Sequence, residues 1–386
     1  MNQVQNIVIL GSTGSVGCQA LEVVEHHPDR FRLVGLASGK GGERLRQQVQ
    51  KYQPLRVAVS DPDALEDLKS SPECSGCELI EGGLDSIDRM VSDDRVDRVV
   101  QAIAGGPGLR STVAALKAGK IVALANKESL VLGGEWLMAL ASASGGRILP
   151  VDSEHSAVFQ VLEGLPIEEV RRIILTASGG PFLDLPLARF PEVTAEEALA
   201  HPTWNMGPKI TIDSATMLNK AIEVIEARWL FGVPLEKIEV VVHPQSIVHS
   251  MVEMVDGSIF AQMGNPDMRV PVQWALSYPH RWVSPATYFD FSSNHRLEFF
   301  PPDLSRFPAL ALGYRVAREG GSSGAAFISA SELAVEKFLA GEISFEQIAL
   351  LVEGALDRHE TIFDPNLQQI LEVDRQVRQE MTSCSF

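Results

Sequence analysis

Residues 6–17 read Asn-Ile-Val-Ile-Leu-Gly-Ser-Thr-Gly-Ser-Val-Gly, and this stretch decides the fold of the N-terminal part of the chain. An apolar strand leads into a turn with glycine at positions 11, 14 and 17, and an apolar helical stripe follows from Ala20. Glycines let backbone N–H groups approach a phosphate at the positive end of a helix. The spacing differs from the commonest G-x-G-x-x-G, and such a turn can be merely structural. Because strand, turn and helix coincide, we predict a dinucleotide-binding turn.

The pattern of apolar residues divides the rest of the chain into three kinds of region. Short apolar runs alternate with helical patterns up to about residue 150, which predicts a parallel α/β sheet. Beyond it, two alternating segments flank Asp256-Gly257, a strong hairpin signal. We therefore expect an α/β protein with these parts: a Rossmann-like NADP-binding domain (1–150), a central α+β catalytic domain with an antiparallel hairpin (151–285), a linker (286–311) and a C-terminal helical domain (312–386).

Composition narrows the class of protein. The 386 residues exceed what one core usually supports, and the formal charge of −17 would repel nucleic acid and anionic lipid. No apolar stretch is long enough to span a bilayer, and the first residues lack a basic secretion signal. Four cysteines are too few for a disulfide framework, so we expect a cytoplasmic protein. The pair Cys74 and Cys77 suggests either a zinc or redox site or, as we favour, an incidental loop pair.

The residues after the second expected strand, 31–37, bear on the choice of cofactor. An NAD enzyme usually places Asp or Glu there for the ribose 2′-hydroxyl, but this chain continues Ser38-Gly39-Lys40-Gly41. Lys40 and Ser38 suit a 2′-phosphate, which predicts NADP. The alternative is that Lys40 is an ordinary exposed loop lysine.

Two acidic residues follow the strand expected at 147–151. Asp152 and Glu154 are two positions apart, so strand alternation would place both carboxylates on one face. Crowded carboxylates need a cation between them, and oxygen ligands suit Mg²⁺ or Mn²⁺. A solvated helix cap is the alternative interpretation.

A helix expected within 213–226 carries a second polar group. Asn219, Lys220 and Glu223 are three and four positions apart, so one flank presents an amide, a cation and a carboxylate together. This pattern suits a phosphate bound beside a metal. A Lys-Glu surface pair would produce the same spacing.

Two loop segments complete the candidate site. Ser178, in the sequence Thr-Ala-Ser-Gly-Gly at 176–180, offers a hydroxyl and flexible backbone to an anion, although a structural turn explains it equally well. Trp204 and Met206 lie in the Pro- and Gly-bounded segment 201–209. Large apolar residues in such a loop suggest a lid over the substrate, or else a loop pinned on the core.

Several of these motifs together resemble one enzyme family, the 1-deoxy-D-xylulose 5-phosphate reductoisomerases. The motifs are GSTGSVG (11–17), ANKES (125–129), PVDSEH (150–155), SGGPF (178–182), HPTWNMGPK (201–209), DSATMLNKAIEVIE (213–226) and HPQS (243–246). The resemblance runs in order from about residue 6 to about residue 316 and weakens in the C-terminal helices. It implies NADPH-dependent conversion of 1-deoxy-D-xylulose 5-phosphate to 2-C-methyl-D-erythritol 4-phosphate, in non-mevalonate isoprenoid biosynthesis, by a homodimer.

The resemblance also assigns roles to individual residues. The metal ligands would be Asp152, Glu154 and Glu223, for Mg²⁺, Mn²⁺ or Co²⁺. The phosphate would be bound by Ser178, Ser214, Asn219 and Lys220, and the sugar backbone by Lys127, Ser153 and His201, while Glu154 and Glu223 would contact the substrate as well as the metal. The catalytic residues would be Lys127 and His201 together with the three metal ligands. The NADPH contacts would be Thr13, Gly14, Ser15, Val16, Gly39, Lys40, Asn126, Glu128 and Gly207. Trp204 and Met206 match the lid.

The chain departs from the family at two places, and two rival functions stay open. Gly41 replaces a usual Asn, which puts one ribose-phosphate contact in doubt. Ile328 and Ser331 replace two asparagines of the family's A-L-N-A-A-N-E, so we expect C-terminal helices repacked around Ile328. The rivals are another NADP-dependent oxidoreductase, of the homoserine or aspartate-semialdehyde dehydrogenase type, and a non-catalytic NADP-binding regulator. Neither needs the three acids around one cation.

Overall fold

The computed structural model describes residues 4–204, 206–293 and 295–383, and its contacts divide the chain into two compact units. Unit 1 consists of Met1–Asn126, Leu137–Ser156 and Asp267–Thr287. Unit 2 consists of Lys127–Trp136, Ala157–Pro266 and Tyr288–Phe386. Each unit is therefore made of three separate segments of the chain, whereas the sequence suggested domains that follow one another along the chain. The expected domain boundaries stay a prediction.

Unit 1 is built on a seven-stranded parallel sheet with the order β4-β3-β2-β1-β5-β6-β7. The strands are β1 (Gln5–Leu10), β2 (Phe31–Ser38), β3 (Arg56–Val59), β4 (Leu79–Gly82), β5 (Arg98–Gln101), β6 (Ile121–Leu124) and β7 (Arg147–Pro150). β1 pairs with β2 on one side and β5 on the other, so the strand order reverses there. Ligands of such sheets bind at the carboxyl ends of the strands beside this reversal. The expected Rossmann-like sheet is confirmed.

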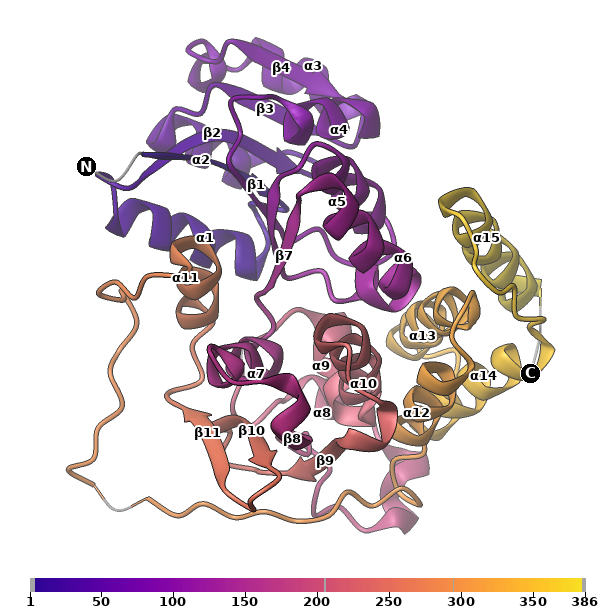
Figure 1. The fold of residues 1–386 in the computed structure, drawn as a ribbon. Helices are drawn as coiled ribbons and strands as arrows, with labels where there is room; N and C mark the ends of the chain where they lie inside the picture. Colours follow the sequence, from indigo (N-terminus) through magenta and orange to yellow (C-terminus); the bar gives the residue numbers. More distant parts are fainter. Residues whose placement is uncertain (1–3, 205, 294, 384–386) are drawn as a thin grey trace. The chain divides into compact units, whose positions relative to one another are not determined.

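Two groups of helices cover the faces of this sheet. The helices are α1 (Ser15–His26), α2 (Glu43–Tyr52), α3 (Asp63–Ser70), α4 (Leu84–Ser92), α5 (Gly108–Lys117) and α11 (Arg269–Ser277). α1 packs on α11, and α4 packs on α5, on opposite sides of the sheet (Figure 1). Right-handed crossovers put α1 and α4 on opposite faces because the chain moves in opposite directions from β1 and from β4. α11 comes from far along the sequence, which is why its return to unit 1 was not expected.

The helix α6 (Glu128–Ser144) belongs to both units. Its backbone is non-helical at Gly133, and the helix passes from unit 2 to unit 1 between Trp136 and Leu137. The first part packs closely in unit 2: a Cβ on Gly134 would lie 2.2 Å from Trp229 Cδ1, and one on Gly324 would lie 2.0 Å from Val131 O. These close approaches fix the start of α6, and therefore Lys127 just before it, against the helices of unit 2.

Unit 2 contains a four-stranded sheet with the order β11-β10-β8-β9 and several helices. The strands are β8 (Val170–Ala177), β9 (Ile238–Val242), β10 (Val248–Met254) and β11 (Ile259–Met263). β10 and β11 pair antiparallel, which confirms the hairpin expected at Asp256-Gly257. The helices between and before them are α7 (Ser153–Leu162), which begins in unit 1, α8 (Ala195–Leu199), α9 (Pro208–Thr216) and α10 (Leu218–Phe231).

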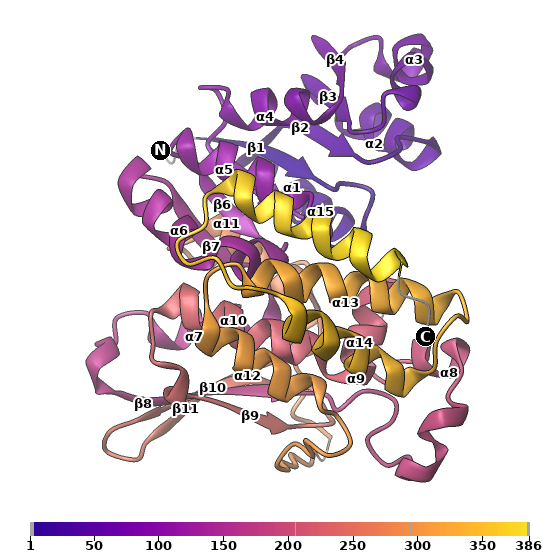
Figure 2. The same ribbon diagram turned by 90° about the vertical axis from the view of Figure 1, so that its right-hand side faces the viewer.

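Four helices form the C-terminal part of unit 2: α12 (Ala309–Glu319), α13 (Ser323–Leu339), α14 (Phe345–Arg358) and α15 (Leu367–Ser383). α13 packs against α14 and α15 (Figure 2), and its side chains Phe327 and Ile328 are fully buried. The expected helical region is confirmed. None of the helices among the described residues combines the length and apolar character that a bilayer crossing requires.

Candidate active site

The glycine turn after β1 has no room for larger residues. Gly11 has φ +71°, and a Cβ there would lie 2.3 Å from Ala102 O, while a Cβ on Gly17 would lie 2.2 Å from Gly11 O. α1 begins at Ser15 directly after this turn, and its first turn contains neither a capping side chain nor an acidic residue. A tight turn leading into a helix end of positive potential fits a pyrophosphate. Of the predicted contacts, Thr13 and Gly14 lie in this turn, and Ser15 and Val16 are the first residues of α1.

A pocket of unit 1 lies beside the turn, at the carboxyl ends of the strands. Its lining comes from β2, the loops after β3 and β5, and helices α4 and α5: Ser38, Gly39, Ser60, Leu84, Ile87, Asp88, Ile103, Pro107, Arg110 and Ser111. The acid in this lining, Asp88, accepts from Arg110 Nε at 2.5 Å, so its charge is compensated. The hydroxyls of Thr13 and Ser38 are 2.9 Å apart, which joins the glycine turn to the pocket.

The segment after β2 contains Lys40, for which the sequence left open a contact to a 2′-phosphate or an ordinary exposed loop lysine. Lys40 is exposed immediately after the pocket residue Gly39. Gly41 has φ +67°, a conformation that glycine and asparagine adopt more readily than other residues. Glycine at position 41 therefore allows the same backbone conformation as the family's usual asparagine, but it lacks the asparagine side-chain amide.

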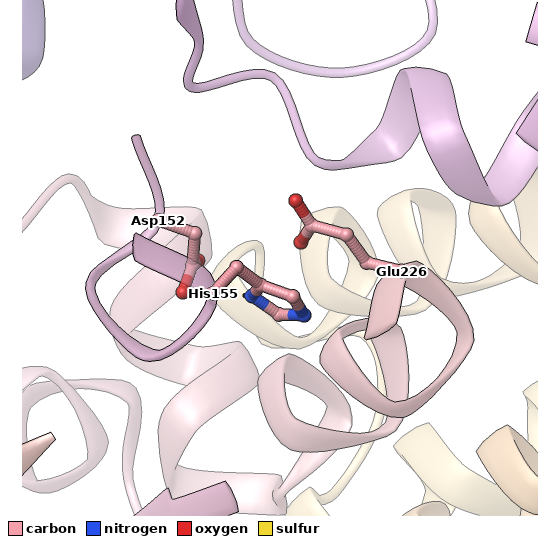
Figure 3. A group of neighbouring side chains, drawn as sticks. All are labelled: Asp152, His155 and Glu226. Carbon is pink, nitrogen blue, oxygen red and sulfur yellow. Dashed lines mark hydrogen bonds and ion pairs between the residues drawn. The ribbon is translucent and has the colours of Figure 1, made fainter. Parts of the chain in front are cut away.

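The structure corrects the reasoning that placed Asp152 and Glu154 on one face of a strand. β7 ends at Pro150 and α7 begins at Ser153, so Glu154 lies in the first helical turn. Asp152 acts as a cap, because its Oδ1 accepts from Glu154 N at 3.2 Å. His155 Nδ1 lies 3.3 Å from the same Oδ1 and orients the carboxylate. Figure 3 draws Asp152 and His155 at the start of α7 and, from the other unit, Glu226 on α10.

In unit 2, Glu223 organises most of the polar group that the sequence predicted on α10. Its carboxylate is fully buried and accepts from Lys127 Nζ at 3.0 Å, and also from Asn219 Nδ2 and Lys220 Nζ. Lys127 Nζ also donates to Asn219 Oδ1 at 2.9 Å. Two ammonium groups compensate a charge that would otherwise be costly to bury. The interpretation as an exposed Lys-Glu pair is therefore wrong.

The start of α10 adds a positive helix end to these charges. Met217 adopts a left-handed conformation with φ 63° and separates α9 from α10, so Asn219 and Lys220 lie in the first turn of α10. The residue before the helix, Met217, makes no side-chain cap hydrogen bond, although Leu218 N donates to Thr216 Oγ1 at 3.3 Å. Lys220 and the helix dipole together favour an anion such as a phosphate.

A second polar group in unit 2 is centred on His201. Its Nε2 lies 3.0 Å from Ser178 Oγ and 3.2 Å from Ser214 Oγ, so the structure brings together three predicted substrate residues. Its Nδ1 accepts backbone N–H bonds from Thr203 at 3.1 Å and Trp204 at 2.9 Å. Nδ1 therefore carries no proton and Nε2 is the donor. Burial lowers the pKa of His201, in agreement with a neutral ring.

The candidate lid packs against a histidine that the sequence did not single out. The rings of Trp204 and His249 are 6.2 Å apart, and burial lowers the pKa of His249 to about 4. Met206 is half-buried in the same segment, and Asn205 lies outside the described residues. His249 was missed because it lies within an alternating β10 segment that reads as an ordinary strand. An imidazole on the buried face of that strand is the signal that could have found it.

Other candidate residues have structural roles. The hydroxyl of Thr176 donates to the backbone of β10, at 2.8 Å from Val248 O, so it is held inside the sheet rather than offered to an anion. Asn126 Nδ2 donates to Ile103 O at 2.7 Å and thereby holds the loop after β5. Burial raises the pKa of the thiols of Cys74 and Cys77, the latter to about 11. That disfavours the thiolates that zinc or redox chemistry needs and favours the incidental loop pair.

Comparison with known proteins decides the family. A model of 1-deoxy-D-xylulose 5-phosphate reductoisomerase matches residues 7–134, and models of reductoisomerase C-terminal domains match residues 148–231 and 263–380. The chain belongs to the 1-deoxy-D-xylulose 5-phosphate reductoisomerase family. Curated reductoisomerases from Chlorobium chlorochromatii and Trichlorobacter lovleyi are 50% and 48% identical. Each comparison covers 96% of this chain, and 97% and 95% of the respective relative.

Solved reductoisomerase structures share the whole fold of this chain. One, a complex with NADPH, fosmidomycin and magnesium, has a TM-score of 0.93 and 39% identity over 98% of both chains. Another, the Zymomonas mobilis enzyme with NADPH, has a TM-score of 0.90 and 40% identity over 99% of this chain and 100% of that one. This reductoisomerase chain therefore retains the complete architecture of both solved relatives.

Proposed function

We propose that the protein rearranges and reduces 1-deoxy-D-xylulose 5-phosphate to 2-C-methyl-D-erythritol 4-phosphate, with NADPH and a divalent cation, in the non-mevalonate route to isoprenoids. The observation that carries the proposal is buried Glu223, whose carboxylate gathers Lys127 and Lys220. Simple hydride transfer does not need such a cluster of charges. The reaction breaks and re-forms one carbon–carbon bond, and the resulting aldehyde is then reduced.

The proposed metal ligands are Asp152, Glu154 and Glu223, which all carry carboxylates. Their carboxylate oxygens suit Mg²⁺, Mn²⁺ or Co²⁺. When bound, the cation would polarise the carbonyl and adjacent hydroxyl oxygens of the substrate. Solved relatives with magnesium support this assignment.

The proposed NADPH contacts come from several loops. Thr13, Gly14, Ser15 and Val16 would hold the pyrophosphate at the start of α1, and Gly39 and Lys40 would hold the adenosine 2′-phosphate. Asn126, Glu128 and Gly207 complete the set. When bound, NADPH would supply the hydride for the reduction. The tight glycine turn, the exposed cation after β2 and the NADPH complexes of solved relatives support these assignments.

The proposed substrate contacts divide into a phosphate group and a sugar group. Ser178, Ser214, Asn219 and Lys220 would bind the phosphate, and Lys127, Ser153, Glu154 and His201 would contact the sugar backbone. The neutral ring of His201 would donate from Nε2 to a substrate oxygen. Lys127 Nζ, already shared between Asn219 and Glu223, would stabilise negative charge that develops on the sugar oxygens.

Trp204 and Met206 are proposed to form a lid that closes on the bound substrate and excludes water. The backbone of Trp204 is tied to His201, so a ligand that engages the imidazole would also move the lid. Tryptophan fluorescence should respond to a phosphonate hydroxamate such as fosmidomycin. If a Trp204→Phe variant shows an equal spectral change, the response does not come from the lid.

The proposed assembly is a homodimer in the cytoplasm. β11 is an edge strand whose side chains Ile259 and Phe260 are 54% and 48% exposed. Exposed apolar side chains on an edge strand invite pairing with another chain. The thiols of Cys18, Cys74 and Cys77 are free, which fits a reducing compartment.

One experiment tests the function against its rivals. NADPH oxidation is followed with and without 1-deoxy-D-xylulose 5-phosphate, and with Mg²⁺ or excess chelator. We expect turnover only when both substrate and cation are present. Turnover in chelator would indicate a dehydrogenase of another type, and NADPH binding without turnover would indicate a regulator.

The same assay tests the cofactor preference. We expect NADPH to be used better than NADH, and Lys40→Asp to narrow the preference by roughly tenfold, because a carboxylate repels the 2′-phosphate. Lys117→Asp, which makes the same charge change at an exposed position of α5, should leave the preference unchanged. Equal use of both cofactors by the unmodified enzyme would contradict the assignment.

A further inference from the structure

Helix α2, which follows β2 in unit 1, is held against the glycine turn by two of its side chains. Gln48 is buried, accepts from Ser12 Oγ and donates from Nε2 to Ser12 O, each at 2.8 Å. Arg44 lies four positions before Gln48 and therefore on the same face of the helix. Its Nη1 donates to Thr13 O, in the glycine turn, at 3.0 Å. The contacts of α2 thus bring a guanidinium group to the edge of the proposed cofactor site.

Arg44 has a charge that no acidic residue compensates. Within the part of the chain that the structure describes, Arg44 forms no ion pair, and the bond from Nη1 leaves Nε and Nη2 without a partner. The neighbouring carboxylate, Glu43, accepts from Arg46 Nη2 at 3.1 Å and from Gln47 Nε2 at 2.9 Å. Arg46 also binds Asp67, through Nη1 at 2.5 Å. Arg46 is therefore engaged, whereas the exposed Arg44 keeps one edge of its guanidinium for an anionic ligand.

The position of Arg44 fits the adenosine 2′-phosphate better than the pyrophosphate. Thr13, whose carbonyl accepts from Arg44, also has its hydroxyl 2.9 Å from Ser38 Oγ at the end of β2. In sheets of this type the adenosine ribose lies at the end of the second strand, and a nearby arginine accommodates the 2′-phosphate in NADP enzymes. The pyrophosphate instead lies at the start of the first helix. Arg44 belongs to the helix after the second strand.

The departure at Gly41 gives this arginine added importance. A Cβ on Gly41 would lie 3.4 Å from Ala64 Cβ and 3.6 Å from Leu68 Cδ1 and Val59 Cγ1. A side chain at this position would therefore begin among apolar groups, and glycine itself offers no side-chain donor. The donor that the family's asparagine would supply must come from another residue of this segment. Arg44, three positions further along, has two N–H groups of the right kind.

We propose that Arg44 is a specificity-determining residue, whose guanidinium binds the adenosine 2′-phosphate of NADPH together with Lys40. Nε and Nη2 lie on one edge of the guanidinium and would donate to two phosphate oxygens, which is the geometry that arginine uses for phosphate. Nη1 would keep its bond to Thr13 O, so the phosphate would be tied to the glycine turn. The inference rests on the proposed NADPH-binding role of unit 1 and adds a residue to it.

Arg44→Gln tests the proposal through the affinities for NADPH and NADH, which differ only by the 2′-phosphate. Nucleotide fluorescence measures both dissociation constants without substrate or turnover. We expect the value for NADPH to rise roughly 10- to 100-fold and the value for NADH to change less than about twofold, because only NADPH loses charge-assisted hydrogen bonds. Arg44→Lys, which keeps the charge but not the planar fork, should give an intermediate loss. Unchanged NADPH affinity in Arg44→Gln overturns the proposal.

The matched control is Arg46→Gln, which removes the same charge from the same helix. Because Arg46 is engaged by Glu43 and Asp67, we expect its loss to change NADPH affinity less than about twofold. An equal loss in both variants would mean that only the net charge of α2 matters, and it would contradict a direct contact. Equal weakening of NADPH and NADH by Arg44→Gln would place Arg44 at the pyrophosphate or in the fold, which also contradicts the proposal. Circular dichroism shows whether each variant is folded.

A second probe separates this inference from the proposed function. Adenosine 2′,5′-bisphosphate carries the 2′-phosphate without the nicotinamide half, and we expect it to displace NADPH from the unmodified protein better than AMP does. Arg44→Gln should remove most of that advantage. If the unmodified protein binds NADPH no better than NADH, the proposed cofactor is wrong. If it prefers NADPH and Arg44→Gln keeps the full preference, only the role of Arg44 is wrong.

Discussion

The glycine turn of unit 1 and the Glu223 cluster of unit 2 are built in opposite ways. The turn uses backbone and small residues from one continuous stretch, and its shape is fixed because a Cβ on Gly11 or Gly17 would overlap neighbouring backbone. The cluster uses long charged side chains from separate elements, and its shape is fixed because buried charges must be paired. A site built from backbone therefore depends on space, whereas a site built from side chains depends on charge balance. A substitution that adds a side chain in the glycine turn should damage only the turn. A substitution that removes a charge from the Glu223 cluster should damage only the cluster.

The largest expected effect comes from removing charge at the centre of the cluster. Glu223→Gln should lower turnover roughly 100- to 1,000-fold, because the cation loses a ligand and Lys127 and Lys220 lose their shared partner. The measurement is kcat with saturating Mg²⁺, together with NADPH affinity, which should stay nearly unchanged. Glu236→Gln, at an exposed position of unit 2, is the control. Normal turnover of the variant in excess chelator would show that the metal assignment is wrong.

The glycine turn should instead be damaged by a substitution that adds a side chain where there is no room for one. In Gly17→Ala the new methyl group would lie 2.2 Å from Gly11 O, so the turn must shift. We expect NADPH affinity to fall about tenfold or more and the free energy of unfolding to fall by about 1–3 kcal/mol. Gly354→Ala in α14 meets only the flexible end of Arg358 and should be neutral or slightly stabilising. Equal behaviour of the two variants would mean that the turn has more room than the structure gives it.

These two regions also differ in how far they could be predicted from the sequence. The turn was predicted together with its strand and helix, because all its determinants lie within twelve consecutive residues. The cluster was predicted only as a helix flank, since nothing local indicates that Lys127 joins it; that contact depends on the kink at Gly133 and on the packing of Gly134 against Trp229. The edge strand β4 was not anticipated because its four residues include only two apolar ones, and none of the four is buried.

Asp152 shows a different kind of failure. The argument that put it on one face of a strand with Glu154 was wrong, because a strand's alternation cannot be extended past the residue where a helix cap takes over. Its role as a metal ligand stays a prediction. His249 was missed because period-two alternation says which residues are buried and not which of them are chemically useful. Whether a buried side chain is chemically useful depends on its burial and on the groups around it, and both are set by tertiary contacts.

His249 allows a test, by pH, of how strongly unit 2 depends on the charge of a buried side chain. Its pKa is lowered from an ordinary value near 6.5 to about 4, so the fold favours the neutral ring. The stability that this neutral ring contributes is fully present above about pH 6.5 and is lost as the pH falls towards about 4, by about 3 kcal/mol in total. Urea unfolding at several pH values in this range measures it. His249→Gln should flatten the slope, whereas His280→Gln at an exposed position should keep it.

The smallest effect on turnover is expected in α13, where the chain departs from its family. Ile328 is fully buried, and the Ser331 hydroxyl is satisfied by donating to Ile328 O at 2.9 Å. Ile328→Asn would replace apolar packing with a buried amide, so the free energy of unfolding should fall by about 1–3 kcal/mol, with turnover changed less than about twofold. Leu350→Asn, at a 60% exposed position of α14, is the control and should be nearly neutral. An almost inactive natural enzyme that asparagines at 328 and 331 restore would show instead that α13 shapes the active site directly.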